Sequence, residues 1–209
     1  MKEYHKIDTL FERDMEGSKK LIEGKFRSST VEFLKDNLWD FTEKIDGTNI
    51  RVVWDGHTVS FYGRTDKAQI PNHLMERLNS LFTTNEAEEI FEQKFGENFV
   101  MLFGEGYGAK IQNGGAYRSD VDFILFDVMV GDIYLERQNV KDIAKAFGLD
   151  VVPVILSGKL SDAVDYVKSK PNSTIGNAKM EGIVGRPRIE LKDRLGNRII
   201  VKIKVCDFE

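Results

Sequence analysis

The sequence predicts an α+β fold in which antiparallel sheets are flanked by helices, and three features lead to this prediction. Short runs of β-branched and aromatic residues, separated by Asp-Gly dipeptides, fill residues 39–62. Apolar residues at helical spacing follow over 72–95. Strands and helices then mix without the regular alternation of a doubly wound fold. No linker rich in Pro, Gly or Ser interrupts the chain, so a single domain over residues 1–209 is expected.

An antiparallel meander is expected first, between Trp39 and Tyr62. Within it, Asp46-Gly47 and Asp55-Gly56 separate runs that contain Ile, Val, Phe and Trp. Asp-Gly between such runs is a signal for a two-residue hairpin turn. Each dipeptide is therefore predicted to join neighbouring strands of one sheet.

Two helices are expected next. The first covers residues 72–82, where leucine and phenylalanine recur with helical spacing. Thr83 and Glu86 have the spacing of a capping box, which predicts the start of the second helix. Gly96 follows its apolar face and suits the helix end.

Shorter signals predict the remaining elements. In chain order these are buried strands at 99–103 and 123–130, helices at 139–147 and 161–168, and late strands at 183–184 and 199–205. Gly148 closes the first of these helices, and Pro171 follows the second. In the last strand Lys202 and Lys204 alternate with Ile and Val, so both lysines are expected on one face.

The composition excludes several classes of protein. A hydrophobic fraction of 41% and a charged fraction of 31% are typical of a globular chain, and no apolar run has the length of about 20 residues that a membrane helix needs. The N-terminus has charged residues and no apolar segment, so no signal peptide is expected. Cys206 is the only cysteine, which excludes an intrachain disulfide and favours a reducing, cytoplasmic setting. The net charge of −4 argues against bulk electrostatic coating of nucleic acid, although residues 186–204 hold a local excess of basic side chains.

Lys44 is the first residue with a chemical interpretation. It lies at the end of a predicted strand, two residues before Asp46-Gly47, and a glycine turn allows close approach of a phosphate. Taken alone, the pattern fits an ordinary hairpin equally well. To attack phosphorus the amine must be uncharged, whereas an exposed lysine has a pKa of about 10.4. Burial or neighbouring cations lower such a pKa, so further positive groups are expected to fold back toward Lys44, and Lys202 and Lys204 are the candidates.

Four other side chains stand at positions suited to a nucleotide. Glu105 and Glu181 lie beside glycines at strand ends, where each could hold a ribose hydroxyl or a divalent ion, or simply occupy a surface turn. Phe126 suits either stacking on a base or packing in the core. Arg64 follows the predicted meander and suits either a bidentate phosphate contact or an exposed loop.

In series, these elements resemble the ordered motif set of the covalent nucleotidyltransferases, the superfamily of ATP-dependent DNA ligases, RNA ligases and mRNA capping enzymes. The elements are Lys44-x-Asp46-Gly47, Arg64, Gly104-Glu105, Phe126-Asp127, Glu181-Gly182 and Lys202-x-Lys204. The resemblance implies the nucleotidyltransferase (ligase adenylation domain) fold, with the nucleotide pocket between antiparallel sheets.

The residue after Gly47-Thr48 favours one subgroup. DNA ligases and many capping enzymes place arginine there, whereas this chain has Asn49 and is similar to the RNA ligase 2 group, best known from phages and trypanosome RNA editing. Phe103-Gly104-Glu105 and Ile111-Gln112 are similar to that group as well. Asp46 stands where the group often has histidine, and Arg186 where it has lysine.

The resemblance also implies a role for each residue. Lys44 would form a covalent lysyl-AMP, the backbone of Glu43 would read adenine, and Phe126 would stack on it. Glu105 would bind the ribose, with Arg64 nearby. The remaining nucleotide-binding residues would be Asp46, Gly47, Asn49, Glu181, Lys202 and Lys204, with the two lysines on the α-phosphate and the leaving pyrophosphate. Glu181 and Glu105 would hold Mg²⁺ or Mn²⁺, through water.

The activity implied is that of an ATP-dependent RNA ligase, which would pass AMP to an RNA 5′-phosphate and seal it to a 3′-OH end. The chain stops five residues after Lys204, so no C-terminal OB-fold or helical domain is expected, and a partner protein or a groove around 186–198 would replace it. Location in the cytoplasm is expected, and in the host cytoplasm for a phage protein. Two alternatives remain: transfer to another polynucleotide end, including a DNA nick or a cap made with GTP, and a non-catalytic nucleotide- or RNA-binding module.

Overall fold

The computed structural model describes residues 3–18 and 20–209, and the chain forms two compact units. The first unit comprises Met1–Tyr4 and Asp46–Val152, and the second comprises His5–Ile45 and Pro153–Glu209. Both units combine helices with largely antiparallel sheets, which confirms the predicted α+β class. Of the helices in the described part of the chain, none has both the length and the apolar character that a membrane span requires.

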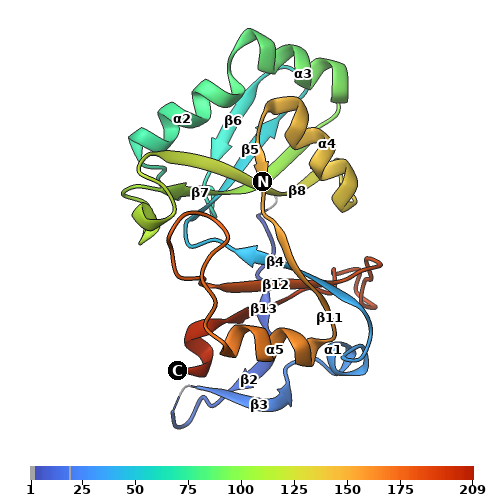
Figure 1. Ribbon diagram of the computed structural model, residues 1–209. Coiled ribbons are helices and arrows are strands. Elements are labelled where there is room, and N and C mark those ends of the chain that lie inside the picture. Colours follow the sequence, from blue (N-terminus) through green and yellow to red (C-terminus); the bar gives the residue numbers. More distant parts are fainter. Residues whose placement is uncertain (1–2, 19) are drawn as a thin grey trace. The chain divides into compact units, whose positions relative to one another are not determined.

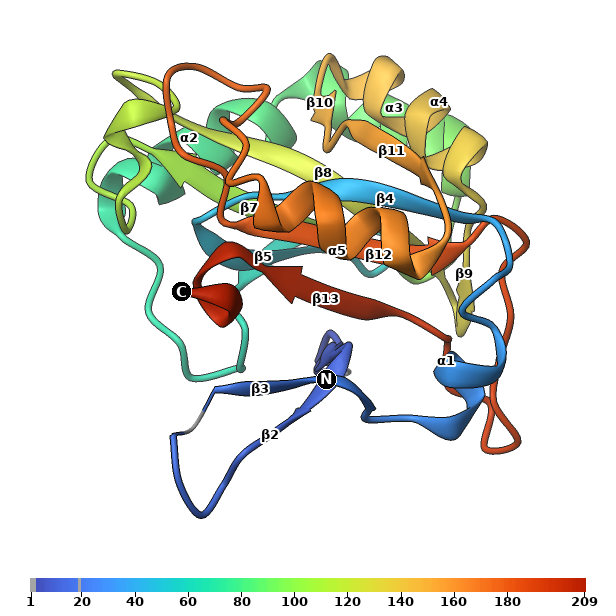
Figure 2. The same ribbon diagram turned by 60° about the horizontal axis from the view of Figure 1, so that its bottom comes forward.

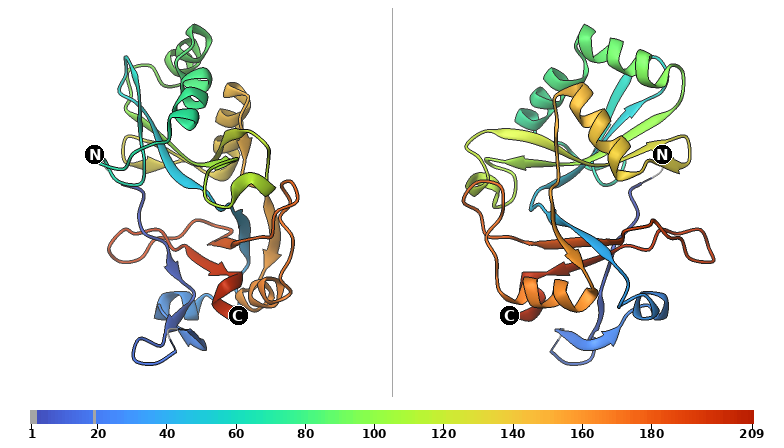
Figure 3. Two further views of the ribbon diagram at one scale, coloured as in Figure 1. Left: turned by 90° about the vertical axis from the view of Figure 1, so that its left-hand side faces the viewer. Right: turned by 45° about the vertical axis from the view of Figure 1, so that its right-hand side comes forward.

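A six-stranded sheet forms the frame of the first unit. In spatial order its strands are β10 (Asp150–Val151), β8 (Val121–Val130), β7 (Val100–Gly108), β5 (Thr48–Trp54) and β6 (Val59–Tyr62), with β9 (Ile133–Tyr134) also paired to β8. Three helices gather on one face of this sheet, namely α2 (Asn72–Phe82), α3 (Asn85–Phe95) and α4 (Arg137–Phe147) (Figure 1 and Figure 3). A short 3₁₀ helix, η1 (Gly114–Ala116), follows β7.

Aromatic rings fill the space between this sheet and its helices. Phe82 of α2 is fully buried and contacts the rings of Phe61, Phe91, Phe123 and Phe147 at centroid distances of 5.5–6.4 Å. The opposite face of the sheet carries a smaller apolar cluster built from Val53, Met101, Phe103 and Met129, on which the partly buried rings of Tyr4, Tyr62, Phe126 and Tyr134 pack. The sheet is therefore covered by apolar contacts on both faces.

A five-stranded sheet forms the frame of the second unit. Its spatial order is β1 (Asp8–Thr9), β13 (Val201–Lys204), β12 (Gly182–Pro187), β4 (Trp39–Lys44) and β11 (Val154–Gly158). β1 is parallel to β13, and the other neighbours are antiparallel. The other elements are the pair of strands β2 (Phe11–Arg13) and β3 (Leu21–Phe26), the helices α1 (Ser29–Phe33) and α5 (Leu160–Lys168), and the 3₁₀ helix η2 (Val205–Phe208).

Alternation along three strands gives this sheet an apolar and a polar face. Phe41, Ile183 and Ile203 are fully buried and belong to one apolar cluster with Leu160, Ala163, Val164 and Val167 of α5. Figure 2 shows α5 lying along the sheet on this side. Because side chains alternate along a strand, the residues between these apolar positions face away from α5. The alternation predicted for Lys202 and Lys204 is confirmed, since Val201 and Ile203 are buried while the lysines are partly exposed.

The predicted helices are confirmed with small shifts at their ends. The helix predicted over 72–82 is α2, and Gly96 ends α3 with a φ of 55°. The capping residue of α3 is Thr84 rather than Thr83: its side chain accepts the backbone N–H of Ala87 at 3.2 Å. Thr83 instead ends α2, where its hydroxyl donates to the carbonyl of Asn79. Two adjacent threonines offer the same cap chemistry, and only the helix register distinguishes them.

The predicted meander is half confirmed. Asp55-Gly56 does join β5 to β6, and the Asp55 carboxylate accepts the backbone N–H groups of His57 and Thr58. The hairpin predicted at Asp46-Gly47 is wrong, because β4 and β5 belong to different sheets. β4 pairs with β11 and β12, which lie more than a hundred residues further along the chain. The turn signal at Asp46-Gly47 therefore marks a change of sheet.

Candidate functional site

A row of three residues crosses the sheet of the second unit at the ends of β4, β12 and β13. Lys44 is paired with Gly182, and Gly182 is paired in turn with Lys204. Directly paired residues of antiparallel strands present their side chains on the same face, so Lys44 and Lys204 share the face opposite α5. Lys202 lies two residues before Lys204 and shares that face as well. β13, the strand that carries Lys202 and Lys204, thus lies two strands away from Lys44 in the sheet.

Gly182 is required between these lysines by close backbone packing. A Cβ atom at this position would lie 2.2 Å from the carbonyl oxygen of Ile203 and 2.8 Å from the Cα of Lys204. Both distances are far below van der Waals contact, so a side chain would push β12 away from β13. The glycine keeps the strands close and leaves the space above it to its neighbours in the row.

Glu181 joins the two lysines. Its Oε2 lies 2.6 Å from Nζ of Lys44, and its Oε1 lies 2.7 Å from Nζ of Lys204. The three side chains are only 27%, 18% and 30% exposed for Lys44, Glu181 and Lys204 respectively. Burial alone would lower the pKa of Lys204, but its hydrogen bond and charge attraction to Glu181 raise the pKa above the usual value.

Glu43 lies on the other face of β4, next to Lys44 in sequence. It is 2% exposed, and its carboxylate accepts hydrogen bonds from the hydroxyl of Ser173 and from the backbone N–H and hydroxyl of Thr174. Its backbone N–H donates to the carbonyl of Pro153 at 3.0 Å. The side chain of Glu43 therefore anchors the loop between α5 and β12, a role that the sequence alone does not indicate.

In the first unit, the Asp46-Gly47 turn packs against the middle of β7. A Cβ on Gly47 would lie 2.4 Å from the carbonyl oxygen of Gly106 and 2.7 Å from Cγ of Glu105. The backbone N–H of Asp46 donates to the hydroxyl of Tyr117 at 3.2 Å. The turn is thus held by two parts of the chain that are distant in sequence.

Asn49, Glu105 and Phe126 share one face of the six-stranded sheet. Asn49 of β5 is paired directly with Glu105 of β7, so their side chains point the same way. The ladder between β7 and β8 shifts at this level: Phe103 is paired with Asp127 and Gly104 with Leu125, which leaves Phe126 as an inserted residue. This bulge places Phe126 against the small apolar cluster, where its ring lies 5.1 Å from the ring of Tyr4.

One polar atom on this face has no partner of its own. The Oδ1 atom of Asn49 is buried and makes no hydrogen bond with any described residue. A buried acceptor without a partner is costly, so such atoms commonly mark a place where a ligand or an ion completes the hydrogen bonding.

Arg64 lies in an exposed loop directly after β6. Arg51, which the sequence does not single out, is buried beneath that loop and donates a hydrogen bond to the carbonyl of Gly63 at 2.9 Å. The only sequence signal for Arg51 is a charged residue within the apolar run of β5, at a position whose neighbours Ile50 and Val52 are buried.

The basic stretch of residues 186–204 is partly neutralised within the chain. Arg188 pairs with Asp40 at 2.8 Å, and Arg198, whose side chain is 4% exposed, pairs with Glu190. These two arginines are therefore engaged in ion pairs, and the lysines of β13 form the part of the stretch that lies beside Lys44.

Few protein side chains are placed to bind a metal ion directly. Within residues 3–18 and 20–209, no group of three or more His, Cys, Asp or Glu side chains lies close enough to hold a metal. Magnesium and manganese, however, bind in many proteins through one or two carboxylates together with water and the phosphates of a ligand. Glu181 and Glu105 fit that mode and do not form a metal site built of protein ligands alone.

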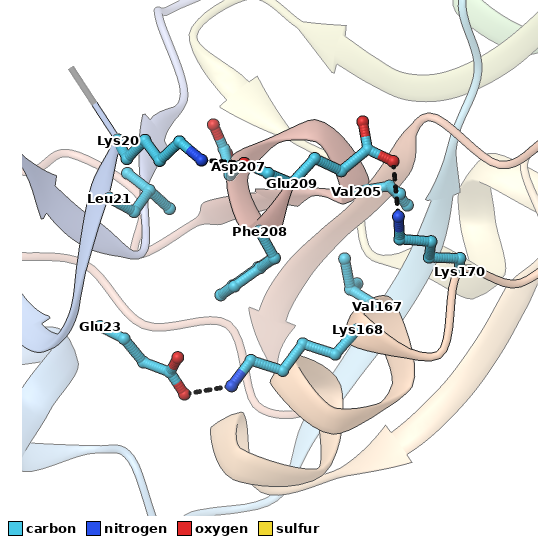
Figure 4. Close-up of a pocket in the computed structure, with 10 residues that line it drawn as sticks. All are labelled: Lys20, Leu21, Glu23, Val167, Lys168, Lys170, Val205, Asp207, Phe208 and Glu209. Carbon is cyan, nitrogen blue, oxygen red and sulfur yellow. Dashed lines mark hydrogen bonds and ion pairs between the residues drawn. The ribbon is translucent and has the colours of Figure 1, made fainter. Parts of the chain in front are cut away.

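The second unit also has a pocket of about 340 Å³ between α5, η2 and β3 (Figure 4). Neither Lys44, Glu181 nor Lys204 lines it. Lys168 and Lys170 line it, and they form ion pairs with Glu23 and Glu209. The charges of Lys168 and Lys170 are therefore neutralised by carboxylates of the same chain, and we assign the pocket no role.

A family model described as RNA ligase matches residues 38–204, a span that contains Lys44, Glu181 and both lysines of β13. No curated protein sequence matches the chain.

Several solved structures of the RNA ligase of Naegleria gruberi are similar in fold. A variant with ATP and manganese is 19% identical with a TM-score of 0.62, and the match covers 84% of this chain and 51% of that one. A variant with AMP and manganese is 19% identical with a TM-score of 0.63, and the match covers 95% and 60%. The complex with pyrophosphate is 18% identical with a TM-score of 0.62, and the match covers 96% and 61%. The chain thus spans about half to three fifths of these relatives, and the likeness establishes the fold.

Proposed function

This chain belongs to the RNA ligase family, and we propose that it is an ATP-dependent RNA ligase whose Lys44 carries the nucleotide during transfer. The observation that carries the proposal is the placement of Lys44 and Lys204 on the two oxygens of one carboxylate, Glu181. The motif order from Lys44 to Lys204 supports it. Residues 1–209 would form a single nucleotidyltransferase domain.

In the first step Nζ of Lys44 attacks the α-phosphorus of ATP. An N–P bond forms, the P–O bond to the leaving pyrophosphate breaks, and the protons that the amine gives up pass to solvent water, which leaves a lysyl-AMP phosphoramidate. Glu181 holds Nζ of Lys44 in an ion pair at 2.6 Å, so the carboxylate has to release Lys44 before the attack. Lys202 and Lys204 would then neutralise the α-phosphate and the leaving pyrophosphate, because phosphoryl transfer depends mainly on positioning and charge neutralisation.

The nucleoside would be held mainly by residues of the first unit, together with the backbone of Glu43 from the second. Glu105 would bind the ribose with Arg64 nearby, and Phe126 would stack on the adenine, which the backbone of Glu43 would read. Asp46 and Gly47 would also contact the nucleotide. The buried Oδ1 of Asn49, which makes no hydrogen bond with a described residue, supports a ligand at this face.

A divalent ion, Mg²⁺ or Mn²⁺, would supply further neutralisation of phosphate charge. Glu181 would hold it, with Glu105 as a second candidate, in both cases through water, because the described residues contain no group of three or more acidic, His or Cys side chains around either carboxylate. A variant of the Naegleria gruberi ligase was solved with ATP and manganese, which supports a divalent ion beside the nucleotide.

In the later steps AMP would pass from Lys44 to an RNA 5′-phosphate, and a 3′-OH would displace AMP to seal the strand. We propose that a groove around 186–198, or a partner protein, assists RNA binding, and the basic side chains of this stretch support the groove. We further propose a phage-type ligase that acts in the cytoplasm, supported by the single, exposed Cys206 and by Gly47-Thr48-Asn49.

The test is incubation with ATP labelled at the α-phosphate and a divalent metal, followed by denaturation and gel analysis. Wild type is expected to carry covalent label, Lys44→Met to carry none, and Lys141→Met, an exposed lysine of α4, to carry as much as wild type. Absence of label on wild type, or label that survives in Lys44→Met, would overturn the proposal. Label from GTP or sealing of nicked DNA would indicate another acceptor, and nucleotide binding that is fully reversed by denaturation would indicate a binding module.

A further inference from the structure

We propose that Arg51 is a positioning residue that fixes the loop carrying Arg64, so that Arg64 reaches the nucleotide from one defined direction. This inference rests on the proposed function, in which Arg64 lies beside the bound nucleotide. Arg51 and the whole of the loop belong to the first unit.

Arg51 lies in β5, the neighbour of the edge strand β6 in the six-stranded sheet. It is paired with Tyr62 of β6 on one side and with Phe103 of β7 on the other, and its side chain is 0% exposed. The guanidinium lies 5.4 Å from the centre of the Tyr62 ring, within the range of a cation–π contact. A full positive charge is therefore held inside the fold, directly beneath the end of β6.

Two hydrogen bonds donated by Arg51 reach residues on either side of Arg64. Nε donates to the backbone carbonyl of Gly63 at 2.9 Å, one residue before Arg64. Nη2 donates to the carboxylate of Asp66 at 2.8 Å, two residues after it. The rigid fork of a guanidinium fixes both contacts at once, which a lysine ammonium cannot do with the same geometry. The backbone at Arg64 is thus tied at both ends to one buried group.

The loop itself is compact. The backbone N–H of Ala68 donates to the carbonyl of Thr65 at 3.1 Å, and a Cβ on Gly63 would lie 2.8 Å from Cβ of Ala68. The hydrogen bond from Arg51 lowers the pKa of Asp66, so this carboxylate stays ionised and paired at neutral pH. Turn contacts and the buried guanidinium together restrict the direction in which Arg64 leaves the sheet.

A residue that only stabilised the fold would not need to be a buried, charged arginine. Burying a charge costs desolvation free energy, and apolar residues of similar volume often replace buried ion pairs without loss of stability. The contacts of Arg51 are directed at the chain on either side of one exposed arginine, which is the geometry expected of a support for that residue.

The experiment measures the rate of covalent adenylylation against ATP concentration for wild type, Arg64→Ala, Asp66→Ala, Arg51→Lys and the double variant Arg64→Ala/Asp66→Ala. Asp66 is 45% exposed, so Asp66→Ala leaves the core intact even where Arg51→Lys folds poorly. We expect Asp66→Ala to lower kcat/KM by about 10-fold and Arg51→Lys by about 10- to 100-fold, because small displacements of a positioned group have effects of this order. The double variant is expected to be no slower than Arg64→Ala alone, because Asp66 acts through Arg64.

Asp55→Ala is the matched control. Like Asp66, Asp55 is a hydrogen-bond acceptor in a surface turn of the first unit. It accepts the backbone N–H groups of His57 and Thr58, so its contacts hold the β5–β6 turn and not the Arg64 loop. We expect it to keep the wild-type kcat/KM. If Arg64→Ala loses activity while Asp66→Ala and Arg51→Lys keep it, or if the losses of Arg64→Ala and Asp66→Ala multiply, the positioning role is overturned and the proposed function stands. Absence of adduct on wild type would overturn both.

Discussion

Glu181 and Lys44 form an ion pair at 2.6 Å, and the second oxygen of the same carboxylate binds Lys204 at 2.7 Å. The proposed nucleophile and the cationic strand are therefore linked through one acidic side chain rather than only lying near each other. The order of the charges across the sheet is lysine, glutamate, lysine. Any anion that binds there has to replace Glu181 as the partner of the two amines.

Replacing Glu181 by Gln should slow adenylylation. The neutral amide cannot balance two ammonium groups, nor can it hold a hydrated divalent ion as well as a carboxylate does. We expect the adenylylation rate to fall by about 100-fold, an effect typical of removing one electrostatic contact from a transfer site. Quantified transfer of label from ATP measures the rate. Glu12→Gln, which breaks an exposed ion pair with Lys25, is the control and should leave the rate unchanged.

The raised pKa of Lys204 predicts a dependence of stability on pH. A lysine whose pKa in the folded state exceeds its ordinary value of 10.5 stabilises the fold while it is protonated. The contribution is complete below 10.5 and is lost as the pH rises through the folded-state value. The difference in unfolding free energy between wild type and Lys204→Met should therefore stay constant from about pH 7 to about pH 9 and shrink above about pH 10.5. Urea unfolding at each pH measures it, and a difference that grows with alkaline pH would contradict the assignment.

Glu43→Ala should destabilise the second unit. The buried carboxylate accepts three hydrogen bonds from Ser173 and Thr174, and its removal leaves buried donors without acceptors. We expect the free energy of unfolding to fall by about 1–3 kcal/mol, the usual cost of such a group. Urea denaturation measures the loss. Glu32→Ala, at an exposed position of α1, serves as the reference and should change the value by less than about 0.5 kcal/mol.

Gly47→Ala should abolish most of the adenylylation activity. The new Cβ would meet the carbonyl of Gly106 at 2.4 Å and the side chain of Glu105 at 2.7 Å, so the turn after Lys44 has to shift. A shift of about 1 Å at such a turn costs on the order of 100-fold in rate. Gly115→Ala is the matched variant, because nothing lies within 4 Å of its Cβ position. Equal activity of the two variants would argue against a tightly packed turn.

Local signals predicted much of the secondary structure. The helices over 72–82 and 139–147 and the alternation around Lys202 were recoverable because spacing within a single segment determines them. β7 extends five residues beyond the predicted end at 103, because Gly104 and Gly106 interrupt its apolar pattern. Those glycines are themselves required, since a Cβ on Gly104 would lie 2.2 Å from the ring of Phe123.

Long-range contacts were not recoverable in the same way. The sequence around Asp46-Gly47 is that of a hairpin, yet the partners of β4 lie far along the chain, and no local pattern identifies them. In the sequence, Arg51 is only a single charged residue in an apolar strand, and its contacts with the loop after β6 cannot be predicted from that pattern. The family follows from motif order, whereas the individual roles of Glu105, Phe126 and Arg64 remain predictions.

The short strand β1 has a practical consequence for expression of the protein. Asp8 and Thr9 lie alongside Val201 and Lys202, and the backbone N–H of Leu10 donates to the carbonyl of Lys202. Trimming the first ten residues to obtain a smaller crystallisable fragment would uncover the backbone edge of β13. Uncovered edges recruit strands from other molecules, so such a fragment should aggregate or pair with copies of itself through the strand that carries Lys202 and Lys204.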